Sequence, residues 1–214
     1  MIPDIVHRFI GIDPSYKGLG LSFIEINNVE RTLFFDEKSV DVGEGSFAEV
    51  TKASIEMCKN IDKVYFLGAE VGMEIPPVNG FYAVKLWALD SRIYEHILQK
   101  DPNNIWLFNV PYLKFINGKD NSKQDTMKMI NDIVEVLKLN DFKVIQCLKN
   151  KKGKERKLTS NQCDSFIYCI RVFIKYCLEN GLYPEIVQDI LNINDRFTVE
   201  KETKTGKTRK EKNN

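Results

Sequence analysis

The sequence predicts an α/β fold in which helices flank a mixed five-stranded sheet, in the order βββαβαβα with a helical extension at the C-terminus. Two patterns lead to this prediction. Three short β-rich segments joined by turns come first, as in an antiparallel meander, and helical and strand-like segments then alternate. The order shows no internal repeat and no interdomain linker, so we expect one domain over residues 1–193 and a basic tail over 194–214.

Five apolar runs bounded by turn-forming residues are the predicted strands. They are His7–Asp13, Leu19–Ile26, Thr32–Phe35, Lys63–Glu70 and Asn104–Val110. Pro14, Gly18 and Gly20 predict a tight turn between the first two. Residues 143–146 form either a short strand or an approach segment, and the pattern does not choose between these.

Five further segments carry apolar residues at helical spacing. They are Ser46–Asn60, Phe81–Gln99, Lys123–Leu139, Asn161–Leu178 and Tyr183–Ile193. Ser46 is the expected N-cap of the first helix, and Thr159 or Ser160 is the expected N-cap of the fourth.

Composition argues against several classes of protein. No apolar stretch approaches the roughly 20 residues that span a membrane, and the N-terminus lacks a signal-peptide pattern, so we expect an intracellular protein. Five dispersed cysteines without a CxxC pair argue against a disulfide framework and a zinc finger. The net charge is +1, but Lys149–Lys157 holds six basic residues and Arg196–Asn214 holds seven. These runs indicate a patch for a polyanion, or else a solvated loop and an unstructured tail.

Acidic residues stand at the ends of the predicted elements. Asp13 and Glu70 each close an apolar strand, and Asp164 lies in the first turn of a helix, three residues after Asn161. If the two strands are parallel neighbours, these oxygen ligands meet at one edge of the sheet and suit Mg²⁺ or Mn²⁺. A pair of such ions clamps the attacking water and the leaving oxygen of a phosphodiester. Each residue also fits a purely structural role, as a turn initiator, a strand end or a helix cap.

Three motifs resemble a known family when taken in order. "GIDPSYKGLG", "GAE" and "NQCDSF" resemble the RuvC-type Holliday junction resolvases of the RNase H-like, or retroviral integrase, superfamily. The segment "NGFYAVKLWALDSRIYEHI" resembles the family's Asn and Ala-x-Lys-Leu pattern before a long helix. "LKFINGKDNSKQDTMKMI" resembles its basic stretch before the next helix. The resemblance covers residues 7 to about 178 and implies an RNase H-like resolvase domain.

The resemblance also implies a catalytic metal site. Its ligands to two Mg²⁺ or Mn²⁺ ions are Asp13, Glu70, Asp164 and Asn161. Asp13 bridges the ions in this scheme, whereas Asn161 departs from the family, which usually has Asp or His there. Its carboxamide contributes no charge, and Glu74 or Glu155 are possible substitutes. The catalytic lysines implied are Lys114 and Lys123, with Lys119 as a competitor for the second position.

Branched DNA, such as a four-way junction, is the implied substrate. Candidate DNA contacts are Met73, Phe81, Tyr82, Lys119, Lys151, Lys152, Lys154, Arg156 and Lys157. Each aromatic or Met side chain also fits a role in core packing, and the lysines fit a solvated loop. The family acts as a homodimer, so residues 81–99, with Trp87 and Tyr94, are either a subunit interface or a core helix of a monomer.

The predicted function is a structure-selective endonuclease of DNA recombination and repair. It is expected to cut Holliday junctions by metal-dependent hydrolysis, leaving a 5′-phosphate and a 3′-hydroxyl. The alternatives are another RNase H-fold nuclease, such as a ribonuclease H or a packaging nuclease, and a DNA-binding protein without catalysis, which the neutral Asn161 suggests. A sugar-kinase-like ATPase requires roughly twice the chain length and ranks low. A phage or viral origin is a further guess.

Overall fold

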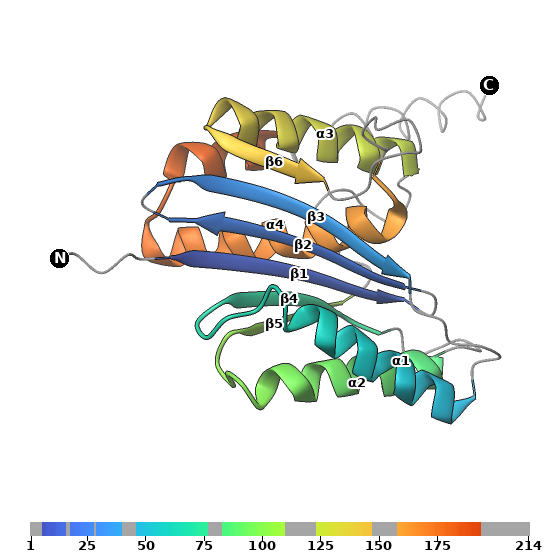
Figure 1. Cartoon of the computed structure of the whole chain (residues 1–214). Coiled ribbons are helices and arrows are strands. Elements are labelled where there is room, and N and C mark those ends of the chain that lie inside the picture. Colours follow the sequence, from blue (N-terminus) through green and yellow to red (C-terminus); the bar gives the residue numbers. More distant parts are fainter. Residues whose placement is uncertain are drawn as a thin grey trace, which may run out of the picture.

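A computed structural model describes residues 6–15, 18–27, 29–39, 46–76, 83–109, 123–146 and 158–193. Its centre is a six-stranded sheet in the order β5-β4-β1-β2-β3-β6 (Figure 1). The strands are β1 (His7–Ser15), β2 (Gly18–Ile26), β3 (Arg31–Ser39), β4 (Glu70–Ile75), β5 (Ile105–Asn109) and β6 (Phe142–Gln146). The helices are α1 (Phe47–Ile61), α2 (Ala83–Leu98), α3 (Lys123–Leu139), α4 (Ser160–Asn180) and an unlabelled helix over 184–193.

The predicted α/β class and the antiparallel meander are confirmed. β1 pairs antiparallel with β2, and β2 with β3, whereas the β1–β4, β4–β5 and β3–β6 pairs are parallel, so the sheet is mixed. The sheet has one strand more than expected because residues 142–146 do pair with β3, from Arg31 opposite Phe142 to Phe35 opposite Gln146.

The fourth strand differs from the prediction in its position along the chain. It begins at Glu70, where the apolar run Lys63–Glu70 was expected to end. Residues before Glu70 instead form turns, in which the amide of Tyr65 donates to Ile61 O and Gly68 adopts a φ of +86°. Val64 and Tyr65 pack against the core beneath α1 and α2, so this run is apolar because of packing, not because of strand pairing.

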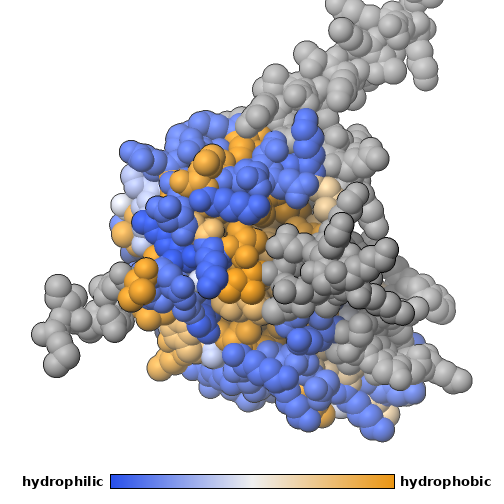
Figure 2. Space-filling model, turned by 45° about the horizontal axis from the view of Figure 1, so that its top comes forward, coloured by the Kyte–Doolittle hydropathy of each residue, from blue (hydrophilic) through white to orange (hydrophobic). Residues whose placement is uncertain are grey.

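Two hydrophobic cores lie on opposite faces of the sheet. Along β1, Ile10 and Ile12 point to the face covered by α1 and α2, and Phe9 points to the face covered by α3 and α4. The two helix pairs are also displaced sideways, with α1 and α2 toward β1 and β4 and α3 toward β6 (Figure 1). On the surface turned toward the reader in Figure 2, a central apolar band is bordered by hydrophilic residues.

Helix α4 lies directly on the central strands because glycines face it. A Cβ atom added to Gly11 would collide with the carbonyl of Ser165, and one added to Gly20 would collide with the carbonyl of Asn161. At Gly72, a Cβ atom would lie 2.7 Å from the Tyr168 carbonyl. The missing side chains therefore let the helix backbone approach three strands at once.

Polar contacts and caps fix how far α4 extends along the sheet. The buried Ser22 Oγ lies 2.8 Å from Ser165 Oγ. Thr159 is the N-cap, because its hydroxyl accepts from the amide of Gln162 while the Gln162 side chain accepts from the amide of Thr159. Gly181, with a φ of +64°, ends the helix in the left-handed conformation that suits glycine.

None of the helices in the described ranges combines the length and apolar character that crossing a membrane requires.

We expect Gly11→Ala to destabilise the fold strongly. The new methyl group must displace the backbone of α4, which should lower the free energy of unfolding by more than about 3 kcal/mol. Gly68→Ala is a suitable control because no atom lies within 4 Å of a Cβ at that position. Its positive φ should cost only about 1 kcal/mol. Urea denaturation followed by circular dichroism measures both, and equal losses would show that α4 does not need the close approach.

Candidate active site

A row of acidic side chains crosses the sheet beneath the start of α4. Asp13 of β1 pairs with Gly20 of β2, and Gly20 pairs with Glu37 of β3. On the other side of β1, Ile12 pairs with Met73 in parallel register, so the next residue of β4, Glu74, is level with Asp13. Because side chains alternate between the faces of a strand, these residues point toward α4, as Gly11 and Gly72 do.

The first two turns of α4 complete this group with three residues. The hydroxyl of Tyr168 donates a 2.8 Å hydrogen bond to Glu74 Oε2. The Nδ2 of Asn161 donates to Glu37 Oε1 at 3.0 Å and to Ser15 Oγ at 3.3 Å. Asp164 lies one turn before Tyr168, and its charge acts on both Asp13 and Glu74. We call Asp13, Glu74 and Asp164, together with Glu37, the acidic row.

Burial and neighbouring charges disfavour the ionised forms of Asp13 and Glu74. Asp13 is only 8% exposed, and burial raises its pKa well above the ordinary value, with further increases from four neighbouring carboxyls. These are Asp164, Glu74, Asp90 and Glu37. Burial and Asp164 also raise the pKa of Glu74, although the hydrogen bond from Tyr168 opposes this. Several carboxylates that repel one another in a buried place are stabilised when a cation binds among them.

The donor set fits a hard divalent cation by its chemistry. Asp13, Glu74 and Asp164 offer carboxylate oxygens from three different elements, which Mg²⁺ and Mn²⁺ prefer to nitrogen or sulfur. Within the described ranges, no three His, Cys, Asp or Glu side chains are gathered closely enough to hold a metal ion in their present conformations. Binding a cation therefore requires these side chains to turn toward one another.

The structure corrects the position expected for Glu70. Glu70 is paired with Phe9, four residues before Asp13, which is a separation of about 13 Å along the strand. Its Oε2 accepts a 2.7 Å hydrogen bond from Trp106 Nε1, and burial raises its pKa, with Asp101 and Glu179 adding to the increase. Glu70 and Asp13 therefore lie at opposite ends of their strands, and Glu74 is the acid level with Asp13.

Of the acids that act on Asp13, Glu74 has a sequence signal, whereas Glu37 and Asp90 have none. Glu74 stands directly before the Pro-rich loop, and this position at the end of the strand is the signal that identifies it. Glu37 lies in a mixed charged segment, and Asp90 lies inside an amphipathic helix, so neither stands out locally. Asp90 is only 4% exposed, and its Oδ1 has no hydrogen-bond partner in the described part of the chain. Burial, with Glu74 second, raises its pKa to about 8.

The other predicted site residues have different outcomes. Met73 is fully buried in the core beneath α1 and α2, which contradicts its assignment as a DNA contact. Lys123 is the first residue of α3, and its side chain is not among those that the structure describes. The candidates outside the described residues are Phe81, Tyr82, Lys114, Lys119, Lys151, Lys152, Lys154, Glu155, Arg156 and Lys157.

We expect Asp90 to make stability fall as the pH rises in metal-free buffer. Its folded pKa of about 8 lies above the ordinary value of 3.8. Its stabilising contribution is therefore complete below about pH 4 and is lost as the pH rises to about 8. The wild type therefore loses stability between these two pH values through Asp90, and Asp90→Asn does not. The difference in unfolding free energy between variant and wild type should shift in favour of the variant by on the order of a few kcal/mol from the lower to the higher pH.

Urea denaturation in EDTA at both pH values measures this change. Any cost of the new amide group that is the same at both pH values cancels when the unfolding free energies at the two pH values are subtracted. The same pH dependence in both proteins would contradict a protonated Asp90.

The fold is similar to that of solved nucleases. The structure of Thermus thermophilus RuvC matches with 12% sequence identity and a TM-score of 0.51, over 83% of this chain and 97% of that chain. T. thermophilus RuvC in complex with a Holliday junction substrate has 13% identity and a TM-score of 0.49, over 80% and 96%. No protein-family model and no curated protein matches the sequence. The first of these likenesses shows that the chain has the RNase H-like fold of RuvC, as its motifs predicted.

Proposed function

We propose that this protein is a metal-dependent endonuclease that hydrolyses phosphodiester bonds of branched DNA at the acidic row. The observation that carries the proposal is the placement of Asp13, Glu74 and Asp164 together at the carboxyl ends of β1 and β4, under the first turns of α4. The raised pKa values of Asp13 and Glu74 are of a kind that is frequent at catalytic sites. The RNase H-like fold and the motif resemblance support nuclease chemistry over other uses of such acids.

Asp13, Glu74 and Asp164 would hold Mg²⁺ or Mn²⁺, because each offers carboxylate oxygens and the charges of Asp164 and Glu74 both act on Asp13. When bound, the cations supply a water of lowered pKa and offset the charge that develops on the phosphate. Tyr168 orients Glu74 through its hydrogen bond. Because burial raises the pKa values of Asp13 and Glu74, these groups release protons when a cation binds, so affinity for the cation rises with pH.

The position of Glu37 argues against the alternative that this protein binds DNA without cutting it. That alternative was suggested by the neutral Asn161, which stands where the family usually has a fourth ligand with charge or a ring nitrogen. In this fold the amide nitrogen of Asn161 is bonded to Glu37 Oε1 at 3.0 Å. A carboxylate from β3 is therefore adjacent to Asn161, and this supports an enzyme with four acids over a protein that only binds.

We expect Glu74→Gln to abolish cleavage and Glu70→Gln to leave it intact. Glu74 is the proposed ligand, and its replacement should lower the cleavage rate more than the roughly hundredfold that typically follows loss of an outer partner of a metal ligand. Glu70→Gln is the matched control, since it makes the same change on the same strand and keeps an oxygen that accepts from Trp106. Cleavage of a labelled four-way junction with Mg²⁺ or Mn²⁺ measures both.

Parallel assays on an RNA–DNA hybrid and a linear duplex separate the substrates. Preferential cutting of the hybrid would favour a ribonuclease H, and equal cutting of all DNA forms would favour a packaging-type nuclease. Asp13→Asn should bind the junction without cutting it. Loss of cleavage in Glu70→Gln with full activity in Glu74→Gln would overturn the assignment of the row.

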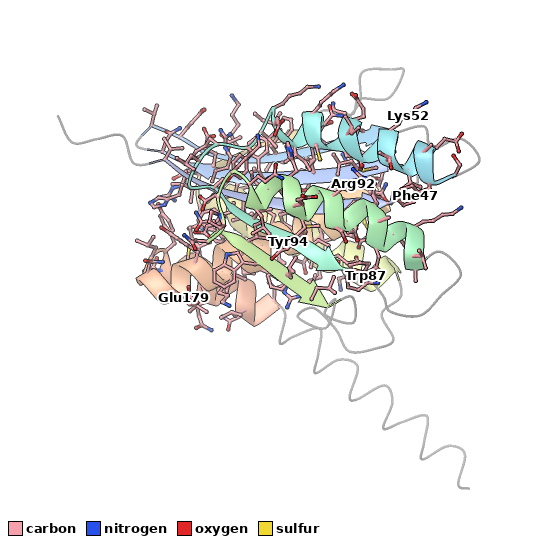
Figure 3. The ribbon with its side chains drawn as sticks, turned by 90° about the horizontal axis from the view of Figure 1, so that it is seen from below. Phe47, Lys52, Trp87, Arg92, Tyr94 and Glu179 are labelled. Carbon is pink, nitrogen blue, oxygen red and sulfur yellow. The ribbon has the colours of Figure 1, made fainter. Side chains whose placement is uncertain are left out.

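We also propose that the protein is a homodimer whose interface includes α2. Val84 and Trp87 on α2 are 80% and 40% exposed, and Phe47 on α1 is 71% exposed. Figure 3 shows Phe47 and Trp87 toward the same end of the helix pair. Large apolar side chains gathered on one surface are typical of interfaces, and a twofold dimer uses such a surface on both subunits. Tyr94 packs against the core, so it is not counted in this surface.

We expect the double substitution Val84→Glu and Trp87→Glu to weaken the dimer, because it places charges on an apolar contact that two subunits share. Sedimentation velocity over a range of protein concentrations measures the shift toward monomer. Leu139→Glu, at an 83% exposed position at the end of α3, is the matched control and should leave the dimer unchanged. A wild-type protein that sediments as a monomer at all concentrations would exclude the dimer.

A further inference from the structure

One stripe of α4 leads away from the acidic row toward the edge of the sheet. Asp164, Tyr168, Arg171 and Lys175 are spaced by four, three and four residues, so they lie on one side of the helix. The stripe therefore starts with an acid, passes through the tyrosine that bonds Glu74, and continues with two cations. At 1.5 Å of rise per residue, Arg171 and Lys175 lie about 10 and 16 Å from Asp164 along the axis.

Aromatic side chains of the edge strand β5 hold both cations in place. The guanidinium carbon of Arg171 lies 4.0 Å from the centroid of the Phe108 ring, and Nζ of Lys175 lies 3.9 Å from the Trp106 ring. Trp106 and Phe108 are two residues apart on β5, so they face the same side. Phe108 also stacks on Tyr168, with 6.2 Å between ring centroids and an interplanar angle of 6°. A series of contacts therefore runs from Glu74 through Tyr168, Phe108 and Arg171 to Trp106 and Lys175, and we call this series the ladder.

The geometry leaves the charge of Lys175 available to a ligand. Lys175 is exposed and forms no ion pair among the described residues, and a cation over a ring is oriented without being neutralised. Two acidic residues lie at the end of the ladder that is far from the acidic row. Glu70 accepts a hydrogen bond from Trp106, and Glu179 lies near the C-terminus of α4 (Figure 3). Two fixed cations in a line between acids suit a chain of separate phosphates better than a single compact anion.

We propose that Arg171 and Lys175, held over Phe108 and Trp106, bind backbone phosphates of the DNA strand that leaves the acidic row along the α4–β5 edge. The distance between these phosphates and the cut rests on the proposed function, which places the cut at the acidic row. For a duplex whose axis runs along α4, a rise of 3.4 Å per nucleotide brings the cations to phosphates about three and five nucleotides from the scissile bond. The site reads the backbone and not the sequence, so it adds affinity to any DNA form.

Lys175→Gln tests the site by removing the charge while keeping a long side chain on the helix. Binding of a labelled four-way junction is measured in EDTA between about 50 and 200 mM salt. We expect affinity to fall about fivefold and the slope of log affinity against log salt to fall by about 1. Lys175→Arg should restore both values. Lys52→Gln, at an exposed position of α1 (Figure 3), is the matched control and should change neither the affinity nor the salt slope. Thermal unfolding confirms that each variant is folded.

Methylphosphonate linkages, which lack the phosphate charge, locate the contact. Neutral linkages three to five nucleotides from the cut, about where the helix rise places the cations, should weaken wild-type binding and have no further effect on Lys175→Gln. Additive losses, or an unchanged salt slope in Lys175→Gln, would overturn the proposal. The affinity and salt slope of Lys175→Gln are independent of catalysis, because a protein that cuts no substrate but shows these two effects would lose the nuclease proposal and keep the phosphate site.

Discussion

The contact of α4 with the central strands is the constraint on which the rest of this structure depends. Gly11, Gly20 and Gly72 lie on three adjacent strands and face the same helix, so its backbone rests where side chains would normally stand. This brings the first turns of α4 over the ends of β1 and β4. If the helix lay at an ordinary packing distance, neither the bond from Tyr168 to Glu74 nor the bond from Asn161 to Glu37 would form.

The same close approach concentrates negative charge where water is scarce. Asp13, Glu74 and Asp90 are each buried enough that desolvation is the first cause of their raised pKa, and repulsion from neighbouring carboxyl groups adds to it. A fold without a function for these groups would gain stability from apolar or paired residues there. The cluster is therefore a cost to the folded protein that a bound cation, as in the proposed function, would relieve.

Helix α4 has different chemistry in its N-terminal turns and in its middle turns. Its N-terminal turns bring Asp164 and the capping network to the acidic row, and its middle turns bring Arg171 and Lys175 to the aromatic rings of β5. Because both groups lie on one rigid helix, their separation is fixed by the helical rise alone. Under the two proposals made above, one element would both set the place of cleavage and guide the DNA strand that leaves it.

Much of this architecture was determined by local sequence. The turn after Asp13, the capping box at Thr159 and the alternation of helical and strand-like segments gave the class, the order and two of the acids, because each depends on residues close together in the chain. Glu74, Glu37 and Asp90 depend on the tertiary structure. An apolar run before Glu70 reads equally well as a strand or as a packed turn, and only the pairing of β4 with β1 sets which acid is level with Asp13. The same register buries Met73 and separates Glu70 from the row, since a shift of a few residues along a strand changes both the face and the end at which a side chain lies.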